Sequence, residues 1–223
     1  MRTRGMDTVI MEVSSHALDQ GRVAGIEFDT AVFTNLTQDH LDYHKTMENY
    51  ARAKARLFDL VSAAGTKAGK TAVLNADDTA SEIMRAHTHC PIIAYGVENS
   101  AELMAQDVHL AQDGMELTLV HDGAVFSRLH IGITGLFNVY NVLAATGAAL
   151  AEGLPASDIV AALSAFTGVP GRFELVRAGQ NFSVIVDYAH TPDGMENVLR
   201  TARAVTRGRI IAVFGCGGDR DRT

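Results

Sequence analysis

The order of apolar and polar positions predicts strands alternating with helices through most of the chain. Short apolar runs at residues 7–13, 31–36, 72–74 and 92–95 are typical of buried strands, the first ending near Glu12. Apolar side chains recur at helical spacing between residues 47 and 64, and a further helix is expected at 78–86. This alternation predicts an α/β fold with a mostly parallel sheet flanked by helices.

Residues 108–133 follow a different pattern. Asp113-Gly114 and Asp122-Gly123 are strong hairpin turns, and the runs at 115–120 and 125–131 are strand-like. We therefore expect an antiparallel meander attached to the parallel sheet.

The last third of the chain contains the best signal for a domain boundary. Two helices are predicted at 137–152 and 157–166, and Gly168-Val169-Pro170-Gly171 follows them. Beyond this segment we expect a strand, a helix, a second strand and a Gly-rich loop, at 183–187, 192–205, 209–214 and 215–218. At about 150 residues per domain, 223 residues make one and a half domains. We expect domains at 1–168 and 169–223.

Composition and charge narrow the class of function. With 26 acidic and 19 basic side chains the net charge is -7, which argues against a nucleic-acid partner. Two cysteines are too few for a disulfide framework, which favours a reducing cytoplasm. Apolar stretches are interrupted before about 18 residues, so no membrane span is predicted.

Acidic, hydroxyl and imidazole side chains are densest at residues 12–16 and 39–44. Both segments follow predicted parallel strands, where ligand sites of open α/β sheets form. Glu12 and His40 are the natural pair for a divalent cation. The alternative, which the spacing alone favours, is that the histidines are loop or helix-cap residues with satisfied hydrogen bonds, namely His16, His40 and His44.

Two segments resemble phosphate-binding loops only weakly. Residues 64–71 approach the pattern GxxxxGK[ST], but Ala64 occupies the first glycine position, and a helix precedes the segment where a strand is required. We interpret it as a solvated connection. The loop at 215–218 lacks the third glycine of GxGxxG.

Four single residues leave two interpretations open. Lys54 lies in an amphipathic helix, where an exposed lysine is the simpler interpretation. Asn138 and Asn141 share a helix face and either read a base edge or cap the helix. Asp187 ends a strand and either meets a ribose or a metal, or caps the next helix.

Taken together, the chain resembles the Mur ligases, and within them the branch that adds a diamino acid. Eight segments carry the resemblance in the same order as in the family: Glu12–Leu18, Phe33–His44, Tyr50–Lys54, Asn75–Asp78, Phe137–Asn141, Pro170–Arg172, Asp187–Pro192 and Phe214–Asp221. Each is modest alone, but eight in series are highly specific.

The resemblance implies a cytoplasmic, monomeric, ATP- and Mg²⁺-dependent amide-bond ligase of peptidoglycan synthesis. In this family a carboxylate of UDP-MurNAc-L-Ala-D-Glu takes the γ-phosphoryl group of ATP to form an acyl phosphate, and the amine of a diamino acid then displaces phosphate. The last of the eight segments is more similar to the meso-diaminopimelate-adding enzymes than to the lysine-adding ones.

The resemblance also assigns roles to residues. It makes Glu12 and His40 magnesium ligands and Lys54 a carbamylated lysine that adds oxygen ligands, which replaces the simpler interpretation of Lys54. It places Ser14, Gln20 and Arg22 at the UDP-MurNAc-dipeptide, and Arg220 at the incoming diamino acid. It places at the nucleotide Asn138, Asn141, Arg172, Asp187 and His190.

The family's uridine-binding domain and phosphate loop should precede Glu12. We therefore expect a fragment: a central ATPase domain without its first strand and phosphate loop, plus the start of a Rossmann-like C-terminal domain. Such a fragment should not ligate alone.

Three alternatives remain. The first is a relative of folylpolyglutamate or cyanophycin synthetases. The residues of the UDP-MurNAc-dipeptide site and the segment 187–190 favour the Mur ligases over this alternative. The second is a non-catalytic remnant. The third is a metal-dependent hydrolase built on His16, Asp39, His40, Asp42 and His44.

Overall fold

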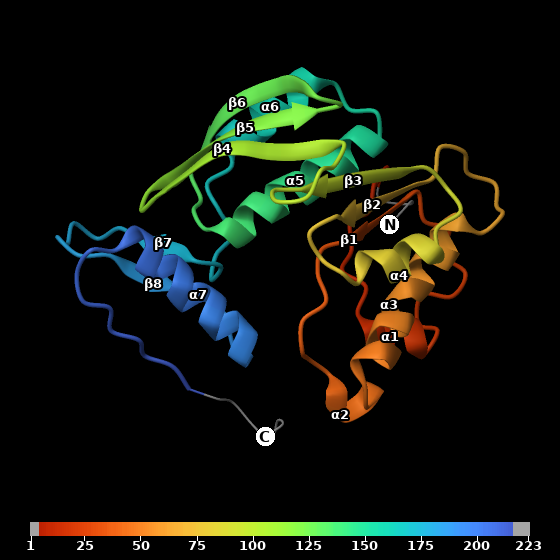
Figure 1. Cartoon of the computed structure of the whole chain (residues 1–223), viewed down its shortest axis with the longest axis horizontal. Helices are drawn as coiled ribbons and strands as arrows, with labels where there is room; N and C mark the ends of the chain where they lie inside the picture. Colours follow the sequence, from red (N-terminus) through yellow and green to blue (C-terminus); the bar gives the residue numbers. More distant parts are fainter. Residues whose placement is uncertain (1–4, 216–223) are drawn as a thin grey trace.

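The computed structural model describes residues 5–215 and contains a six-stranded sheet whose strands lie in chain order (Figure 1). The strands are β1 (Thr30–Phe33), β2 (Thr71–Asn75), β3 (Ile92–Gly96), β4 (Leu103–Ala111), β5 (Gly114–His121) and β6 (Ala124–Ile131). β1 to β4 pair in parallel, whereas β4, β5 and β6 form an antiparallel meander. Asp122 and Gly123 both have positive φ, 51° and 76°, as the tight β5–β6 turn requires. The predicted α/β class and the meander are confirmed.

Helices cover both faces of the sheet. They are α1 (Ser15–Asp19), α2 (Leu41–His44), α3 (Met47–Ser62), α4 (Ser81–Ala86), α5 (Leu136–Ala151) and α6 (Ala156–Ala165). α3 and α4 pack on one face of β2, and α5 on the other. The longest have 16 residues, and in the described part of the chain no helix is long and apolar enough to cross a membrane.

The C-terminal part forms a smaller unit. β7 (Glu174–Val176) and β8 (Val184–Val186) pair antiparallel, and α7 (Pro192–Val205) follows. Thr191 caps α7 by accepting the Gly194 N–H at 3.1 Å, and Pro192 occupies the first turn. The predicted strand and helix are present, whereas β7 was not predicted because three residues carry no periodic signal.

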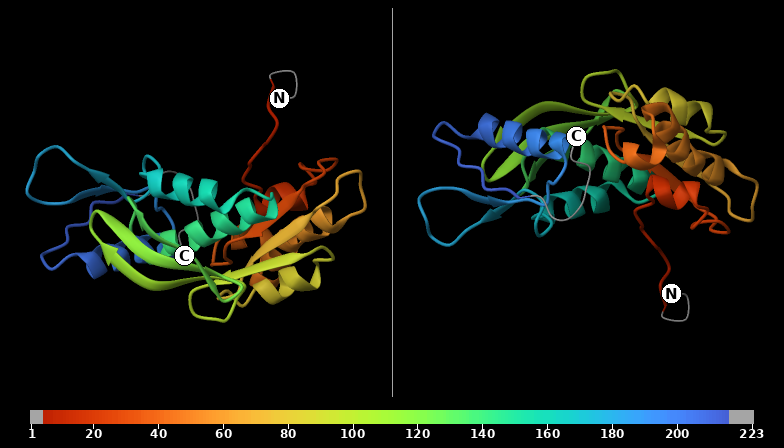
Figure 2. Two further views of the ribbon diagram at one scale, coloured as in Figure 1. Left: turned by 90° about the horizontal axis from the view of Figure 1, so that it is seen from above. Right: turned by 90° about the horizontal axis from the view of Figure 1, so that it is seen from below.

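Two predicted strands are wrong. Residues 7–13 are extended without ladder bonds and lead away from the body of the molecule (Figure 2), with Ile10 96% exposed. Residues 209–214 are likewise irregular, with Val213 94% exposed. An apolar run becomes a strand only where a neighbouring backbone accepts its hydrogen bonds, and within residues 5–215 neither segment has such a neighbour.

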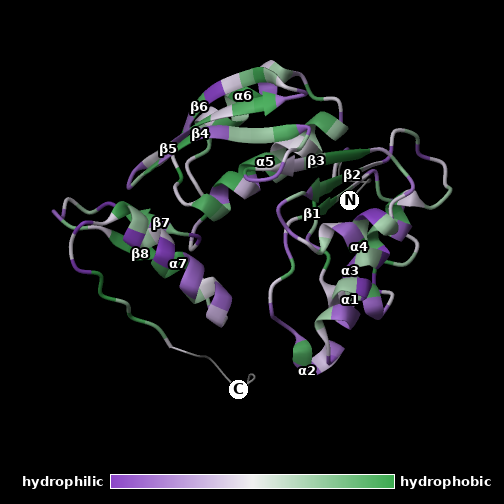
Figure 3. Cartoon of the chain, in the orientation of Figure 1, coloured by the Kyte–Doolittle hydropathy of each residue, from purple (hydrophilic) through white to green (hydrophobic). Residues whose placement is uncertain are grey.

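The core forms because buried strands present alternate side chains to opposite faces. Ala72 and Leu74 of β2 pack with α3 and α4, whereas Val73 packs with α5. Figure 3 shows the corresponding hydrophobic colouring of β1 to β3, and the mixed hydrophobic and hydrophilic colouring of α3, which packs on one face of the sheet. α5 lies so close to β2 that a Cβ on Gly147 would be 2.7 Å from Val73 Cγ1.

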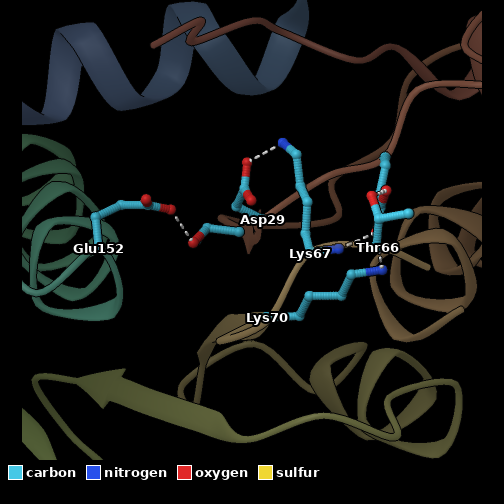
Figure 4. Close-up of polar contacts among 7 residues, drawn as sticks. Asp29, Thr66, Lys67, Lys70 and Glu152 are labelled. Atoms are coloured by element: carbon cyan, nitrogen blue, oxygen red, sulfur yellow. Dashed lines mark hydrogen bonds and ion pairs between the residues drawn. The ribbon is translucent and has the colours of Figure 1, made fainter. Parts of the chain in front are cut away.

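Residues 63–70 connect α3 to β2, which confirms that they form a solvated connection and not a phosphate loop. Glu27 accepts hydrogen bonds from the Lys67 N–H and the Thr66 hydroxyl at 2.8 and 2.9 Å, and Lys70 Nζ lies 3.1 Å from it. Lys67 pairs with Asp29 (Figure 4). Both lysines are therefore engaged by carboxylates of this chain.

Candidate functional site

Lys54 lies in the middle of α3, half-buried and surrounded by acidic groups. Burial lowers the pKa of Lys54 below its usual value, and the carboxylates of Glu12, Asp39 and Asp78 only partly offset this effect. Glu12 lies three positions before the start of α1, Asp39 two positions before α2, and Asp78 three positions after the end of β2. The fold thus gathers acidic residues from three segments around one amine.

His40 is the N-cap of α2 and has a strained backbone. Its φ is 56°, which places it in the left-handed region, and its N–H donates to Asp39 Oδ1 at 2.8 Å. The imidazole Nε2 lies 3.4 Å from Asp39 Oδ2. Such conformations persist where the surroundings hold them, and they cluster at functional sites.

An aromatic cluster lies between His40 and Lys54. The Tyr50 ring centroid is 5.2 Å from Lys54 Nζ, and the His44 ring stacks on Tyr50 with centroids 5.2 Å apart. His16 lies against His40, with ring centroids 4.8 Å apart. His44 is buried and its Nε2 is 2.9 Å from Ser15 Oγ, so it is a satisfied core histidine. Among residues 5–215, no three His, Cys, Asp or Glu side chains are arranged to hold a metal ion.

The three residues assigned to the UDP-MurNAc-dipeptide lie along α1 and its end. Ser14 caps the helix by accepting the Ala17 N–H at 3.2 Å, and Gln20 is the C-terminal cap. Gly21 then turns the chain with φ 65°, so that the Arg22 N–H reaches Ala17 O at 2.8 Å. Arg22 Nη2 donates to Gln20 Oε1 at 2.5 Å. The helix end therefore fixes Gln20 and Arg22 side by side.

A hydrogen-bonded group beside them was missed in the sequence. Tyr43 Oη donates to Asp19 Oδ2 at 2.7 Å, and Arg56 Nη1 is 2.9 Å from Asp19 Oδ1. Gln20 Nε2 donates to Tyr43 Oη at 3.5 Å. Tyr43 lies within a segment that resembles the family, but nothing in the sequence pairs it with a residue 24 positions earlier.

The five residues that the family resemblance places at the nucleotide all line one cavity of about 740 Å³. α5 contributes two of the five, Asn138 and Asn141. The chain after α6 contributes the other three, Arg172, Asp187 and His190. Apolar side chains of α5, α6 and α7, including Val142, Leu163 and Val198, form much of the remaining wall, and further polar groups line it. An apolar chamber with a few polar groups is typical of small-molecule sites.

Hydrogen bonds orient the two asparagines. Asn141 Nδ2 donates to Asn138 Oδ1 at 3.1 Å, and Asn138 Nδ2 donates to Thr134 O at 2.8 Å. Neither caps α5, whose cap is Gly135 without a side-chain bond, so the capping interpretation is wrong.

The opposite wall is organised by Asp187. Its carboxylate accepts the N–H groups of Phe173 and Ala189, both at 2.7 Å, so it holds two loops together. It does not cap α7, because Thr191 does. Arg172 lies over the Tyr188 ring, 5.1 Å from the centroid, and sequence reasoning did not single out that tyrosine.

The His190 ring is anchored locally, with Nδ1 3.0 Å from Tyr188 O. Arg220 and most of the Gly-rich loop at 215–218 lie outside the described residues.

Comparisons with known proteins point to the same family in both parts of the chain. Residues 1–149 match the family described as "Mur ligase middle domain", and residues 171–223 match "Mur ligase, glutamate ligase domain". The UDP-N-acetylmuramoyl-L-alanyl-D-glutamate--2,6-diaminopimelate ligase of Bacillus velezensis is 51% identical over 224 residues, which cover 100% of this chain and 46% of that protein.

Solved structures agree with these matches. A structure of a UDP-N-acetylmuramoyl-L-alanyl-D-glutamate--2,6-diaminopimelate ligase has a TM-score of 0.73 at 36% identity, covering 94% of this chain and 42% of that one. The apo form of L. casei FPGS, at 20% identity and a TM-score of 0.65, covers 83% and 44% and shares the fold alone. The chain thus spans about half the length of the relatives it matches, and it belongs to the Mur ligase family.

Proposed function

We propose that this chain is the nucleotide- and metal-holding part of an ATP-dependent, cytoplasmic ligase that joins a diamino acid, meso-diaminopimelate, to UDP-MurNAc-L-Ala-D-Glu. The carboxylate attacks the γ-phosphorus and ADP leaves; the amine then attacks the acyl carbon and phosphate leaves. The observation that carries the proposal is Lys54, an amine with a lowered pKa among the carboxylates of Glu12, Asp39 and Asp78.

The donor set fits magnesium once Lys54 is modified. Mg²⁺ prefers oxygen ligands, which Glu12 supplies, whereas an ammonium is not a ligand. A lowered pKa favours the neutral amine, whose nitrogen bonds to the carbon of CO₂ and releases a proton. The carbamate then offers two oxygens, and with Glu12 and His40 it would hold the ion. Bound there, Mg²⁺ would neutralise charge between the phosphates and the substrate carboxylate.

The cavity supports the nucleotide assignment. Two of its side-chain amides, Asn138 and Asn141, lie together on α5 and are groups that recognise a base edge, and Arg172 offers a guanidinium to phosphate. The cavity lies across the domain boundary that we propose at residue 168, so both parts would contribute to the nucleotide site. Ser14, Gln20 and Arg22 would hold the UDP-MurNAc-dipeptide, and Arg220 the diamino acid.

The decisive experiment places residues 1–223 into the Bacillus velezensis relative in exchange for its aligned segment. We expect the chimera to consume UDP-MurNAc-L-Ala-D-Glu only with ATP and Mg²⁺, and to prefer meso-diaminopimelate over lysine. Lys54→Ala should lower kcat by at least about a hundredfold, because it removes two metal-ligand oxygens. Short carboxylic acids should partly restore the rate. Lys67→Ala, which removes an exposed lysine of the α3–β2 connection, is the control.

The alternatives give different results. A metal-dependent hydrolase would be indifferent to Lys54→Ala, and a folylpolyglutamate-type ligase would not accept the muramyl substrate. Neither is favoured here: the likeness to FPGS extends to the fold alone, and the five residues proposed for the hydrolase form no three-ligand group within residues 5–215.

A further inference from the structure

Two opposite charges at the end of α1 do not pair with each other. Asp19 is the last residue of α1 and Arg22 follows three positions later. Within residues 5–215, the ion pair of Asp19 is with Arg56 of α3 (Nη1–Oδ1 2.9 Å), and Arg22 has no carboxylate within 4.0 Å. In the same range of residues, the Arg22 guanidinium donates one hydrogen bond, to the neutral amide oxygen of Gln20.

Both oxygens of Asp19 are engaged elsewhere. Arg56 takes Oδ1, and the Tyr43 hydroxyl donates to Oδ2 at 2.7 Å. Arg56 also donates to the Asp19 main-chain oxygen at 3.2 Å. The Tyr43 hydrogen bond, with a smaller effect of Arg56, lowers the pKa of Asp19, so its carboxylate is charged at neutral pH. Side-chain hydrogen bonds through Gln20 and Tyr43 link this carboxylate to the Arg22 guanidinium, so Asp19 is a competitor for any anionic ligand of that guanidinium.

We propose that Arg56 and Tyr43 are positioning residues that hold Asp19 away from Arg22 and so keep the Arg22 guanidinium available for a carboxylate or phosphate of the substrate. The inference rests on the proposed role of Arg22. Both residues act in this proposal through Asp19, which each of them contacts. The ligand chemistry follows from the donors present, a forked cation beside an amide.

Removing the Arg56 guanidinium should free the Asp19 carboxylate to compete for Arg22. In Arg56→Gln, Asp19 loses its ion-pair partner and can turn to Arg22, to which Tyr43 and Gln20 link it, but exposed ion pairs are weak. We therefore expect anion binding at Arg22 to weaken by about two- to fivefold. If competition is the cause, removing the charge of Asp19 in the same chain must restore binding, which loss of structure would not do.

The experiment follows the guanidinium signal of Arg22 by ¹⁵N NMR in the full 223-residue chain. The chain is titrated with L-Ala-D-Glu and, separately, with UDP. The anionic groups of the first probe are carboxylates and those of the second are phosphates, so the two series tell which anion Arg22 takes. Arg52→Gln, one turn earlier on α3 and paired with Glu48 at 2.7 Å, is a matched control for the change of charge. Melting curves establish that each variant is folded.

We expect a saturable shift in the wild type and in Arg52→Gln, a Kd two- to fivefold higher in Arg56→Gln, and a wild-type Kd in Asp19→Asn/Arg56→Gln. An unchanged Kd in Arg56→Gln overturns the inference, and so does a double variant that stays weak. If neither probe shifts the wild-type signal, the inference and the substrate role of Arg22 both fail. The ligase proposal is tested separately, by Lys54→Ala in the chimera.

Discussion

Asp77 shows how much one carboxylate can hold together in this fold. It follows β2, and it accepts backbone hydrogen bonds from the turn after β3: Val97 at 2.6 Å, Glu98 at 3.0 Å and Asn99 at 2.6 Å. The Tyr140 hydroxyl of α5 donates to it at 2.9 Å. Asp77 therefore ties two strands to the helix that carries the proposed nucleotide asparagines.

We expect Asp77→Ala to lower the free energy of unfolding by about 2–3 kcal/mol, because it leaves four donors without an acceptor, of which those of Val97 and Tyr140 are partly buried. Asp77→Asn keeps one acceptor oxygen and should lose less. Denaturant unfolding measures both, and Asp113→Ala, in the exposed β4–β5 turn, is the control. Equal stability of Asp77→Ala and the control would contradict this role.

At the residue scale, the sequence indicated which residue types carry the chemistry but not how they meet. Glu12 and Lys54 were singled out through their segments, and the fold brings both to one site. The bonds of Tyr43 and Arg56 to Asp19 join residues 24 and 37 positions apart, and no periodicity encodes such a contact. Only the folded chain reveals them.

At the scale of elements, the close packing of α5 on β2 depends on a residue without a side chain. Gly147 is buried in α5, and a Cβ there would lie 2.7 Å from Val73 Cγ1. Alanine favours a helix by about 1 kcal/mol over glycine, but the clash is with a stiff, buried side chain.

We therefore expect Gly147→Ala to destabilise the chain by about 1–3 kcal/mol, measured by thermal or denaturant unfolding. Gly208→Ala, where a Cβ would meet nothing within 4 Å, should be neutral or slightly stabilising. A gain in stability from Gly147→Ala would show that α5 can move away from β2 at little cost.

The α3–β2 connection should be sensitive to acid. The Lys67 N–H, with smaller contributions from Thr66 and Lys70, lowers the pKa of Glu27 from 4.5 to about 2. A carboxyl whose pKa is lower in the folded than in the unfolded chain stabilises the fold. This stabilisation is fully present at pH values above the unfolded-state pKa. The stabilisation is lost as the pH falls through the folded value.

The melting temperature of the wild type should thus exceed that of Glu27→Gln at neutral pH, and the difference should shrink between pH 4.5 and about 2. Melting curves across this range measure the effect. Parallel curves for the two proteins at all pH values would refute the assignment of Glu27.

Elements were predictable where local pattern and tertiary pairing agree. β2 has a continuous apolar run and is paired on both sides, so the prediction was confirmed. Residues 7–13 have an equally apolar run, but pairing is a property of the neighbours and not of the run. The short helices α1 and α2, of five and four residues, were missed because they span hardly one turn.

At the scale of the molecule, the cavity joins the sheet domain to the C-terminal unit through α5 on one side and residues 172–198 on the other. If ATP binds there, as we propose, it should stabilise only the folded state, by about 2.7 kcal/mol at a hundred times its Kd. Asn141→Leu should reduce the ATP-dependent rise in melting temperature, because it removes an amide from the cavity wall.

Asn181→Leu, in the exposed loop between β7 and β8, is the matched control and should keep the full rise. An unchanged shift in Asn141→Leu would place the nucleotide elsewhere.

The origin of the oxygen in the released phosphate tests the ligase account most directly. The chimera that carries residues 1–223 is given ATP, meso-diaminopimelate and substrate labelled with ¹⁸O in the carboxylate that becomes the amide. An acyl phosphate leaves one carboxylate oxygen on phosphorus when the amine attacks, so each amide formed should yield one ¹⁸O-labelled phosphate. Amide formation with unlabelled phosphate, or label lost only to water, would contradict the account.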